Sequence, residues 1–175
     1  MDWWDRHLYE FEFPQEKLRI TNDGETYEEF KFYQKKYKDK ALTKRNDPHG
    51  MIAHILETTI RQPQTLKIDR YLEKYKTITY VYDFGDNWQH KIELEKIIDD
   101  YEFGYPTILE GDGACPPEDV GGIPGYEEFL RVWNDQEDAE HEEMRKWGEN
   151  QYYRPFDIAF RNNLLKTCLK IKKVK

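Results

Sequence analysis

Two runs of alternating apolar and polar residues, 77–84 and 88–97, flank a Gly-Asp-Asn break. Both runs are rich in Ile, Val, Tyr and Trp, and two such runs around a turn signal predict a β-hairpin. With a two-residue loop, odd positions of the first run share a face with even positions of the second. We therefore expect one apolar face with these members: Val81, Asp83, Trp88, His90, Ile92 and Leu94. If the loop is Asp86-Asn87, Asp83 stands directly opposite His90.

Other segments complete an α+β pattern. Residues 7–13 alternate like a half-buried strand that ends at Pro14 and turns His7 toward the apolar face, and residues 17–22 predict a second strand. Apolar residues spaced by three and four predict helices that open near Thr26, Asp47, Gly125 and Asp157. Thr26 and Glu29 form a capping-box pattern at the first start, and Gln62-Pro63 is expected to end the second helix. We expect a single α+β domain over residues 1–175, with an antiparallel sheet around the hairpin (about 77–97) covered by helices.

Residues 114–122 combine a thiol, two prolines, two acids and a glycine pair. This density of Pro and Gly excludes a helix or regular strand and predicts a shaped loop. The two prolines stiffen it and hold Cys115 extended. Glu118 and Asp119 follow the rigid part, where they either aim at a ligand or cap the next helix.

The 83–90 hairpin and the 114–122 loop together define a candidate cleft. Its residues are His7, Asp83, Asp86, Trp88, His90, Cys115, Glu118 and Asp119. A carboxylate beside an imidazole in a poorly hydrated place favours the charged ring and fixes its tautomer, but a satisfied structural pair fits the same pattern. Imidazole and thiolate suit zinc or another divalent metal, with His7, His90 and Cys115 as candidate ligands. Their spacing gives no independent support, and no other cofactor is indicated.

The run YDFGDNWQH, followed by YP, ACPPEDVGG and GYEEF, resembles the plasmid pRiA4b ORF-3 family. WWDRHLYEF near the N-terminus and the Pro155-Phe156-Asp157 helix start extend the resemblance over most of the chain. The resemblance implies a small α+β domain, with labels that point to plasmids, mobile elements and resolvases. Members usually have a strand and a helix before the position of Trp3, so we expect a late start or a sheet lacking one element. Tyr9 stands where the family often has a second histidine.

Charge and composition limit the classes of function and the cellular environment expected for this protein. The net charge of −8 and pI near 5.2 argue against nucleic acid as the main partner, although residues 31–45 and 161–175 are basic. We expect these runs to be solvated faces, with 170–175 a mobile tail. The chain lacks an apolar run of membrane-spanning length and a signal-peptide pattern, so a cytoplasmic protein away from membranes is expected. Two distant cysteines do not make a disulfide framework, and Cys168 is expected in the core.

Common catalytic motifs are missing. The sequence has no GxxxxGK[ST], GxGxxG, HExxH, CxxC or GxSxG pattern, and it contains no serine, which argues against a serine recombinase. We favour a binding or interaction domain that uses the candidate cleft, without catalysis, for a protein partner or a second copy. The alternatives are a metal-assisted or acid–base enzyme in the same cleft, and a nucleic-acid-binding protein of a mobile element.

Overall fold

The computed structural model describes residue 3 and residues 6–169, and the chain forms two compact units. The sheet unit is Arg6–Lys96, and the helical unit combines Met1–Asp5 with Ile97–Lys175. Strands and helices are both present, so the predicted α+β class is confirmed. The predicted tail at 170–175 lies outside the described residues. No described helix has both the length and the apolar character needed to cross a membrane.

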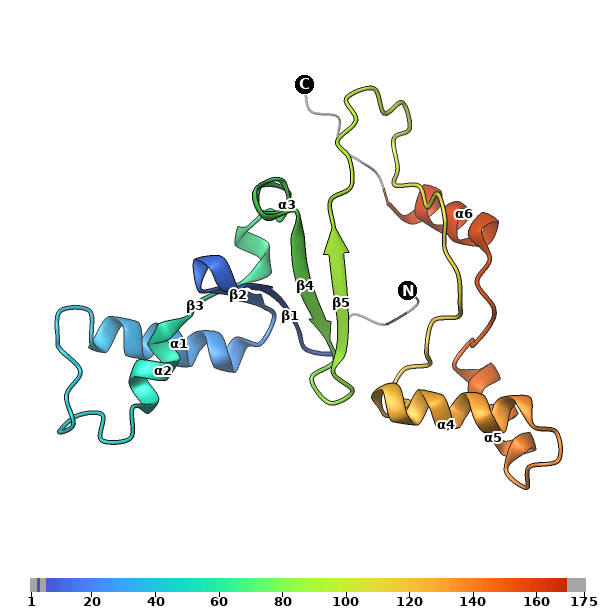
Figure 1. Cartoon of the computed structure of the whole chain (residues 1–175), viewed down its shortest axis with the longest axis horizontal. Helices are drawn as coiled ribbons and strands as arrows, with labels where there is room; N and C mark the ends of the chain where they lie inside the picture. Colours follow the sequence, from blue (N-terminus) through green and yellow to red (C-terminus); the bar gives the residue numbers. More distant parts are fainter. Residues whose placement is uncertain (1–2, 4–5, 170–175) are drawn as a thin grey trace. The chain divides into compact units, whose positions relative to one another are not determined.

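The sheet unit contains one five-stranded sheet in the order β3-β2-β1-β4-β5 (Figure 1). The strands are β1 (Tyr9–Phe13), β2 (Leu18–Thr21), β3 (Thr59–Arg61), β4 (Thr77–Tyr82) and β5 (Trp88–Glu93). All neighbours pair antiparallel except β2 and β3, which are parallel. The predicted hairpin is β4 and β5, and it forms one edge of the sheet.

Helices and two short 3-10 turns connect these strands. They are η1 (Pro14–Glu16), α1 (Gly24–Lys36), α2 (Met51–Glu57), η2 (Pro63–Thr65) and α3 (Asp69–Tyr75). Asp23 caps α1 by accepting hydrogen bonds from the backbone N–H groups of Glu25 and Thr26, so the predicted capping box at Thr26 is wrong. The helix expected to continue to Pro63 instead ends at Glu57 and gives way to β3.

One face of the sheet carries the main hydrophobic core. Phe13, Leu18, Ile20 and Ile78 are buried there together with Tyr71 of α3. The rings of Phe13 and Tyr71 lie 4.4 Å apart between centroids. Full burial of such side chains contributes about 1.5–3 kcal/mol each, which is why α3 stays on this face.

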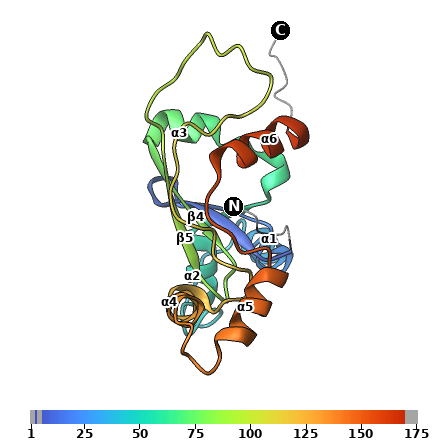
Figure 2. The ribbon, with the colours of Figure 1, turned by 90° about the vertical axis from the view of Figure 1, so that its right-hand side faces the viewer.

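The helical unit contains α4 (Gly122–Asn134), α5 (His141–Asn150) and α6 (Ile158–Cys168). Helices α4 and α5 lie side by side in both views (Figures 1 and 2). Phe129 of α4 is the centre of their contact, because its ring meets Trp133, Trp147 and Tyr153. The prediction that Cys168 is buried is wrong: α6 has no buried residue, and Cys168 is exposed at its last turn.

Candidate functional site

The hairpin has a different register from the predicted one. Tyr80 stands opposite His90, and Tyr82 stands opposite Trp88. These four side chains therefore share a face, and Asp83 lies beyond the last pair. The expectation that Asp83 faces His90 is wrong.

A five-residue loop, 83–87, causes this difference. Asp83 and Asn87 both adopt left-handed backbone conformations, with φ of 55° and 54°. Asp and Asn tolerate this region because their short polar side chains bond locally, and Asp83 Oδ1 accepts a hydrogen bond from Gly85 N–H at 2.9 Å. The longer loop moves Val81 to the face opposite His90.

Asp83 is paired with His7 instead. His7 Nδ1 lies 3.5 Å from Asp83 Oδ2, and Asp83 N–H donates to the Leu8 carbonyl at 2.9 Å. The imidazole meets the Tyr82 ring edge-on, with centroids 5.7 Å apart. Asp83 is 8% exposed. A nearly buried carboxylate beside an imidazole can orient that ring for acid–base chemistry or metal binding, and it can equally serve as a structural pair.

His90 has a separate environment. Its Nδ1 lies 3.3 Å from the Tyr80 carbonyl oxygen, and the two rings are 5.5 Å apart. His90 lies on β5, which borders one side of β4. His7 lies two residues before β1, which borders the other side of β4. The two imidazoles thus have different partners within the sheet unit. Trp88 is half-buried in β5, and Asp86 is half-buried in the loop.

In the helical unit, residues 114–122 form the shaped loop that the sequence predicts. The indole of Trp3 donates to the Pro116 carbonyl at 2.9 Å. Pro117 and Glu118 are buried, whereas Cys115 is half-buried. The stiff proline pair therefore fixes one end of the loop, with the Glu118 carboxylate held inside and the Cys115 thiol partly accessible.

A tyrosine pair holds the other side of this loop. Tyr126 O–H lies 3.3 Å from the Ala114 carbonyl and 3.2 Å from the hydroxyl of Tyr153. Burial, followed by the hydrogen bond with Tyr153, raises the pKa of Tyr126 far above its usual range. Tyr126 therefore links the start of the loop to Tyr153 through its hydroxyl group.

Asp119 does not cap α4. The N-cap residue is Gly121, which has φ of 92°, and Asp119 itself is left-handed with φ of 56°. These two residues with positive φ, separated by Val120, turn the chain into the helix. The N-cap position of α4 is therefore occupied by Gly121 rather than by Asp119, and contact of Asp119 with a ligand stays a prediction.

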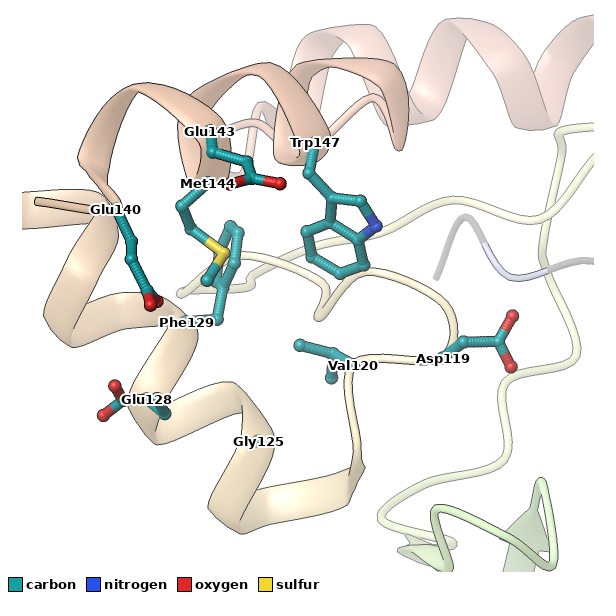
Figure 3. Close-up of a pocket in the computed structure, with 9 residues that line it drawn as sticks. All are labelled: Asp119, Val120, Gly125, Glu128, Phe129, Glu140, Glu143, Met144 and Trp147. Carbon is teal, nitrogen blue, oxygen red and sulfur yellow. The ribbon is translucent and has the colours of Figure 1, made fainter.

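The same turn borders a groove between α4 and α5 with a volume of about 540 Å³ (Figure 3). Its apolar floor is formed by Val120, Phe129, Met144 and Trp147. Its acidic rim is formed by Glu128 on α4 and by Glu140 and Glu143 at the start of α5. Asp119 borders the groove, but its carboxylate points away from the floor (Figure 3).

The rim carboxylates differ in how they are neutralised. Glu128 accepts two hydrogen bonds from Arg131, at 2.8 and 2.7 Å, and this guanidinium lowers the pKa of Glu128. Glu140 and Glu143 are exposed and face the same opening. The groove thus combines an apolar floor with negative charge at its edge. In the sequence, Met144 and Trp147 are the only apolar anchor of this acidic segment, which predicts a solvated helix packed by its end. The sequence does not indicate that this anchor lines a groove with α4.

Comparison with known proteins agrees with the motifs. The sequence model for plasmid pRiA4b ORF-3-like proteins matches residues 1–163. The chain belongs to this family. Among curated proteins, uncharacterized protein y4hQ from Sinorhizobium fredii (strain NBRC 101917 / NGR234) is 42% identical over 78 residues, covering 44% of this chain and 40% of that protein.

A solved structure extends the comparison to the fold. The pRiA4b ORF-3-like chain resembles the crystal structure of MM3350, a protein of unknown function from Methanosarcina mazei Go1, with a TM-score of 0.59 and 30% identity. The match covers 91% of this chain and 75% of that one. This chain spans less than half of the curated relative's length.

Proposed function

We propose that this pRiA4b ORF-3-like protein is a binding domain and that the groove between α4 and α5 receives its ligand. The observation that carries the proposal is an apolar floor of half-buried Val120, Met144 and Trp147 beside exposed carboxylates. Phe129 also borders the groove, but its side chain is only 1% exposed. Aromatic and methionine side chains supply adaptable contact surface, and a charged rim selects partners by sign. The matching ligand is a segment of a protein partner that carries an aromatic side chain flanked by lysines or arginines.

The alternative is that the acidic residues at the start of α5 only stabilise the helix. Glu142 and Glu143 lie in the first turn of α5, where negative charge stabilises a helix through its dipole. Glu142 does not line the groove, whereas Glu143 does. Comparing these two positions separates helix stabilisation from ligand binding.

The test is fluorescence polarisation with a labelled Lys-Phe-Lys-Lys peptide. We expect saturable binding that weakens with salt, because exposed charges are screened over roughly 10 Å at 0.1 M ionic strength. Glu140→Gln with Glu143→Gln should weaken binding by roughly tenfold. The control, Glu127→Gln with Glu142→Gln, removes one carboxylate from α4 and one from α5 outside the groove and should bind normally. Equal losses in both variants, or binding of a Glu-Phe-Glu-Glu peptide with the same affinity, would exclude the groove.

The cleft predicted from the sequence adds a finer proposal: the 83–90 hairpin and the 114–122 loop also contact the ligand. Trp88→Ala and Cys115→Ala test the two parts separately in the same assay. Loss of affinity in either variant, with unchanged thermal unfolding, supports that part. Unchanged affinity in both variants would exclude the predicted cleft as part of the binding site. The proposal for the α4–α5 groove would still stand.

A second candidate function is a metal-assisted or acid–base enzyme. The supporting observation is the His7–Asp83 pair, because a carboxylate commonly orients a catalytic or metal-binding imidazole. Elemental analysis of protein purified without added metal tests the metal version, with His7, His90 and Cys115 as proposed zinc ligands. Stoichiometric zinc that is lost in His7→Ala, His90→Ala and Cys115→Ala would support it. Substoichiometric metal, unchanged by these substitutions, rules against it.

A further inference from the structure

A second surface of this chain has the chemistry that the groove requires. The α1 patch consists of Phe32, Lys35, Lys36 and Lys40, which border one hollow at the end of α1 together with a single carboxylate, Asp39. Phe32 is 57% exposed, and Lys36 Nζ lies 5.3 Å from the centre of its ring. The patch therefore offers an exposed apolar ring together with ammonium groups, which are the two kinds of contact that the groove's floor and rim require.

The charges of the two surfaces are opposite and unusually concentrated. Residues 31–45 contain seven lysines and arginines against one aspartate, in a chain whose net charge is −8. Residues 135–149, which include the groove's rim on α5, contain seven carboxylates against two cations, Arg145 and Lys146. Complementary patches of this kind accelerate association and select partners.

We propose that the α1 patch of one molecule binds in the α4–α5 groove of a second molecule of the same chain. This inference rests on the proposed function, since it names the partner of that groove. In the contact, the Phe32 ring covers the apolar floor, and Lys35 and Lys36 face Glu140 and Glu143. An apolar ring and an apolar floor leave water together, while the charges fix the orientation.

A polyanion such as single-stranded nucleic acid is a poorer match for the α1 patch. Bases can stack on the exposed Phe32 ring, but that contact would use the α1 patch alone. A polyanion would also leave the apolar floor of the groove in water and would be repelled by its acidic rim. Only the second copy accounts for both surfaces at once.

The contact joins two different surfaces, so each molecule offers one patch and one groove. Such heterologous contacts produce chains or closed rings rather than symmetric dimers. With a single aromatic anchor and exposed charges, the association should be weak and sensitive to salt. Sedimentation velocity on the full chain should therefore show a weight-average mass that rises with protein concentration and falls with added salt.

Charge-reversed variants test the pairing directly. Lys35→Glu with Lys36→Glu removes the patch, and Glu140→Lys with Glu143→Lys removes the groove's rim. Each variant alone should sediment as a monomer, because it lacks one half of the contact. An equimolar mixture should form a 1:1 complex, because one variant keeps an intact groove and the other an intact patch. Phe32→Ala should weaken self-association roughly tenfold without any change of charge.

Matched controls carry the same charge changes elsewhere. Lys67→Glu with Lys96→Glu, and Glu127→Lys with Glu142→Lys, should self-associate like the unaltered protein. Thermal unfolding of every variant checks that each is folded. A wild-type chain that stays monomeric at all concentrations, or a mixture that forms no complex, overturns the self-association. If the Lys-Phe-Lys-Lys peptide still binds the groove in that case, the proposed binding function stands and only its partner is wrong.

Discussion

His7 Nδ1 lies 3.5 Å from Oδ2 of Asp83, where the hairpin loop begins. The other carboxylate oxygen of Asp83 accepts the Gly85 N–H at 2.9 Å, while its own backbone N–H donates to Leu8. One aspartate therefore links the segment before β1 to the turn between β4 and β5. It does so in a left-handed conformation, with φ of 55°.

Asp83→Ala should destabilise the protein by roughly 1–3 kcal/mol, because it removes the turn acceptor and places a residue poorly suited to positive φ. Asp83→Asn should cost less, because asparagine keeps the acceptor and tolerates the same backbone. Urea unfolding at neutral pH measures both. Equal losses in the two variants would mean that the charge facing His7, rather than the turn, dominates at this position.

The N-cap of α1 gives a prediction with a definite pH dependence. The Thr26 hydroxyl, and then the backbone N–H groups that Asp23 accepts, lower the pKa of Asp23. Because the pKa of Asp23 is lower in the folded state than the 3.8 of the unfolded state, the ionised carboxylate stabilises the fold at pH values above 3.8. This stabilisation is lost as the pH falls through the folded-state pKa. Asp23→Ala should therefore cost about 1 kcal/mol at pH 7.

That cost should shrink as the pH falls below the unfolded pKa of 3.8, because the wild-type carboxylate is then being protonated. Asp23→Asn is the control, because asparagine retains a neutral acceptor for the cap. The stability of this variant should not change with the protonation that affects Asp23 at acid pH. Urea titrations at a series of pH values compare the three proteins. A wild-type-to-alanine difference that does not change with pH would contradict the charged cap.

The pKa of Glu12 is shifted in the opposite direction to that of Asp23. Burial, followed by the neighbouring Glu10 carboxylate, raises the pKa of Glu12, while Arg19 opposes the shift. Arg19 is already bound to Glu10, with Nε 2.8 Å from Oε2. The ionised Glu12 is therefore unfavourable in the fold, and the stability present below the unfolded pKa of 4.5 is lost as the pH rises through the folded value.

Glu12→Gln should consequently stabilise the sheet unit at pH 7. Because Glu12 is half exposed, solvent screening limits the gain to roughly a few tenths of a kcal/mol. The gain should disappear below about pH 4.5, where the wild-type side chain is also neutral. Chemical denaturation at pH 4 and pH 7 gives the comparison, and a larger gain at pH 4 would refute this account.

The strands of the hairpin could be predicted from sequence, but the direction of their side chains could not. Periodicity places β4 and β5, whereas register depends on loop length, and the five-residue loop follows from left-handed Asp83 and Asn87. The capping box at Thr26 fitted a known pattern, yet Asp23 lies earlier and already bonds two backbone N–H groups. Local rules give several acceptable answers at such positions, and the tertiary structure selects one.

The groove escaped prediction for a different reason. Residues 134–143 are nearly all polar or acidic. Met144 and Trp147 indicate that the helix packs by its end, but nothing in the sequence identifies α4 as the partner. The contact depends on Phe129 of α4 and on a glycine one turn beyond Met144, which allows close approach of the helices. A glycine inside an otherwise helical pattern is the sequence feature that marks such packing.

Gly148 is the position where this packing can be tested. A Cβ atom there would lie 2.5 Å from Cζ3 of Trp133 and 3.0 Å from Cζ of Phe129. Gly148→Ala should therefore destabilise the helical unit by about 1–3 kcal/mol, despite the better helix propensity of alanine. It should also weaken peptide binding, because separation of the helices distorts the groove's floor.

Gly24→Ala is the matched control, since a Cβ at this first residue of α1 meets nothing within 4 Å. This substitution should be neutral or stabilise the protein by up to about 1 kcal/mol, because alanine restricts the unfolded chain. Thermal and urea unfolding of both variants separates close packing from backbone entropy. If Gly148→Ala were as stable as Gly24→Ala, the helices would not approach as closely as the Phe129 and Trp133 contacts require.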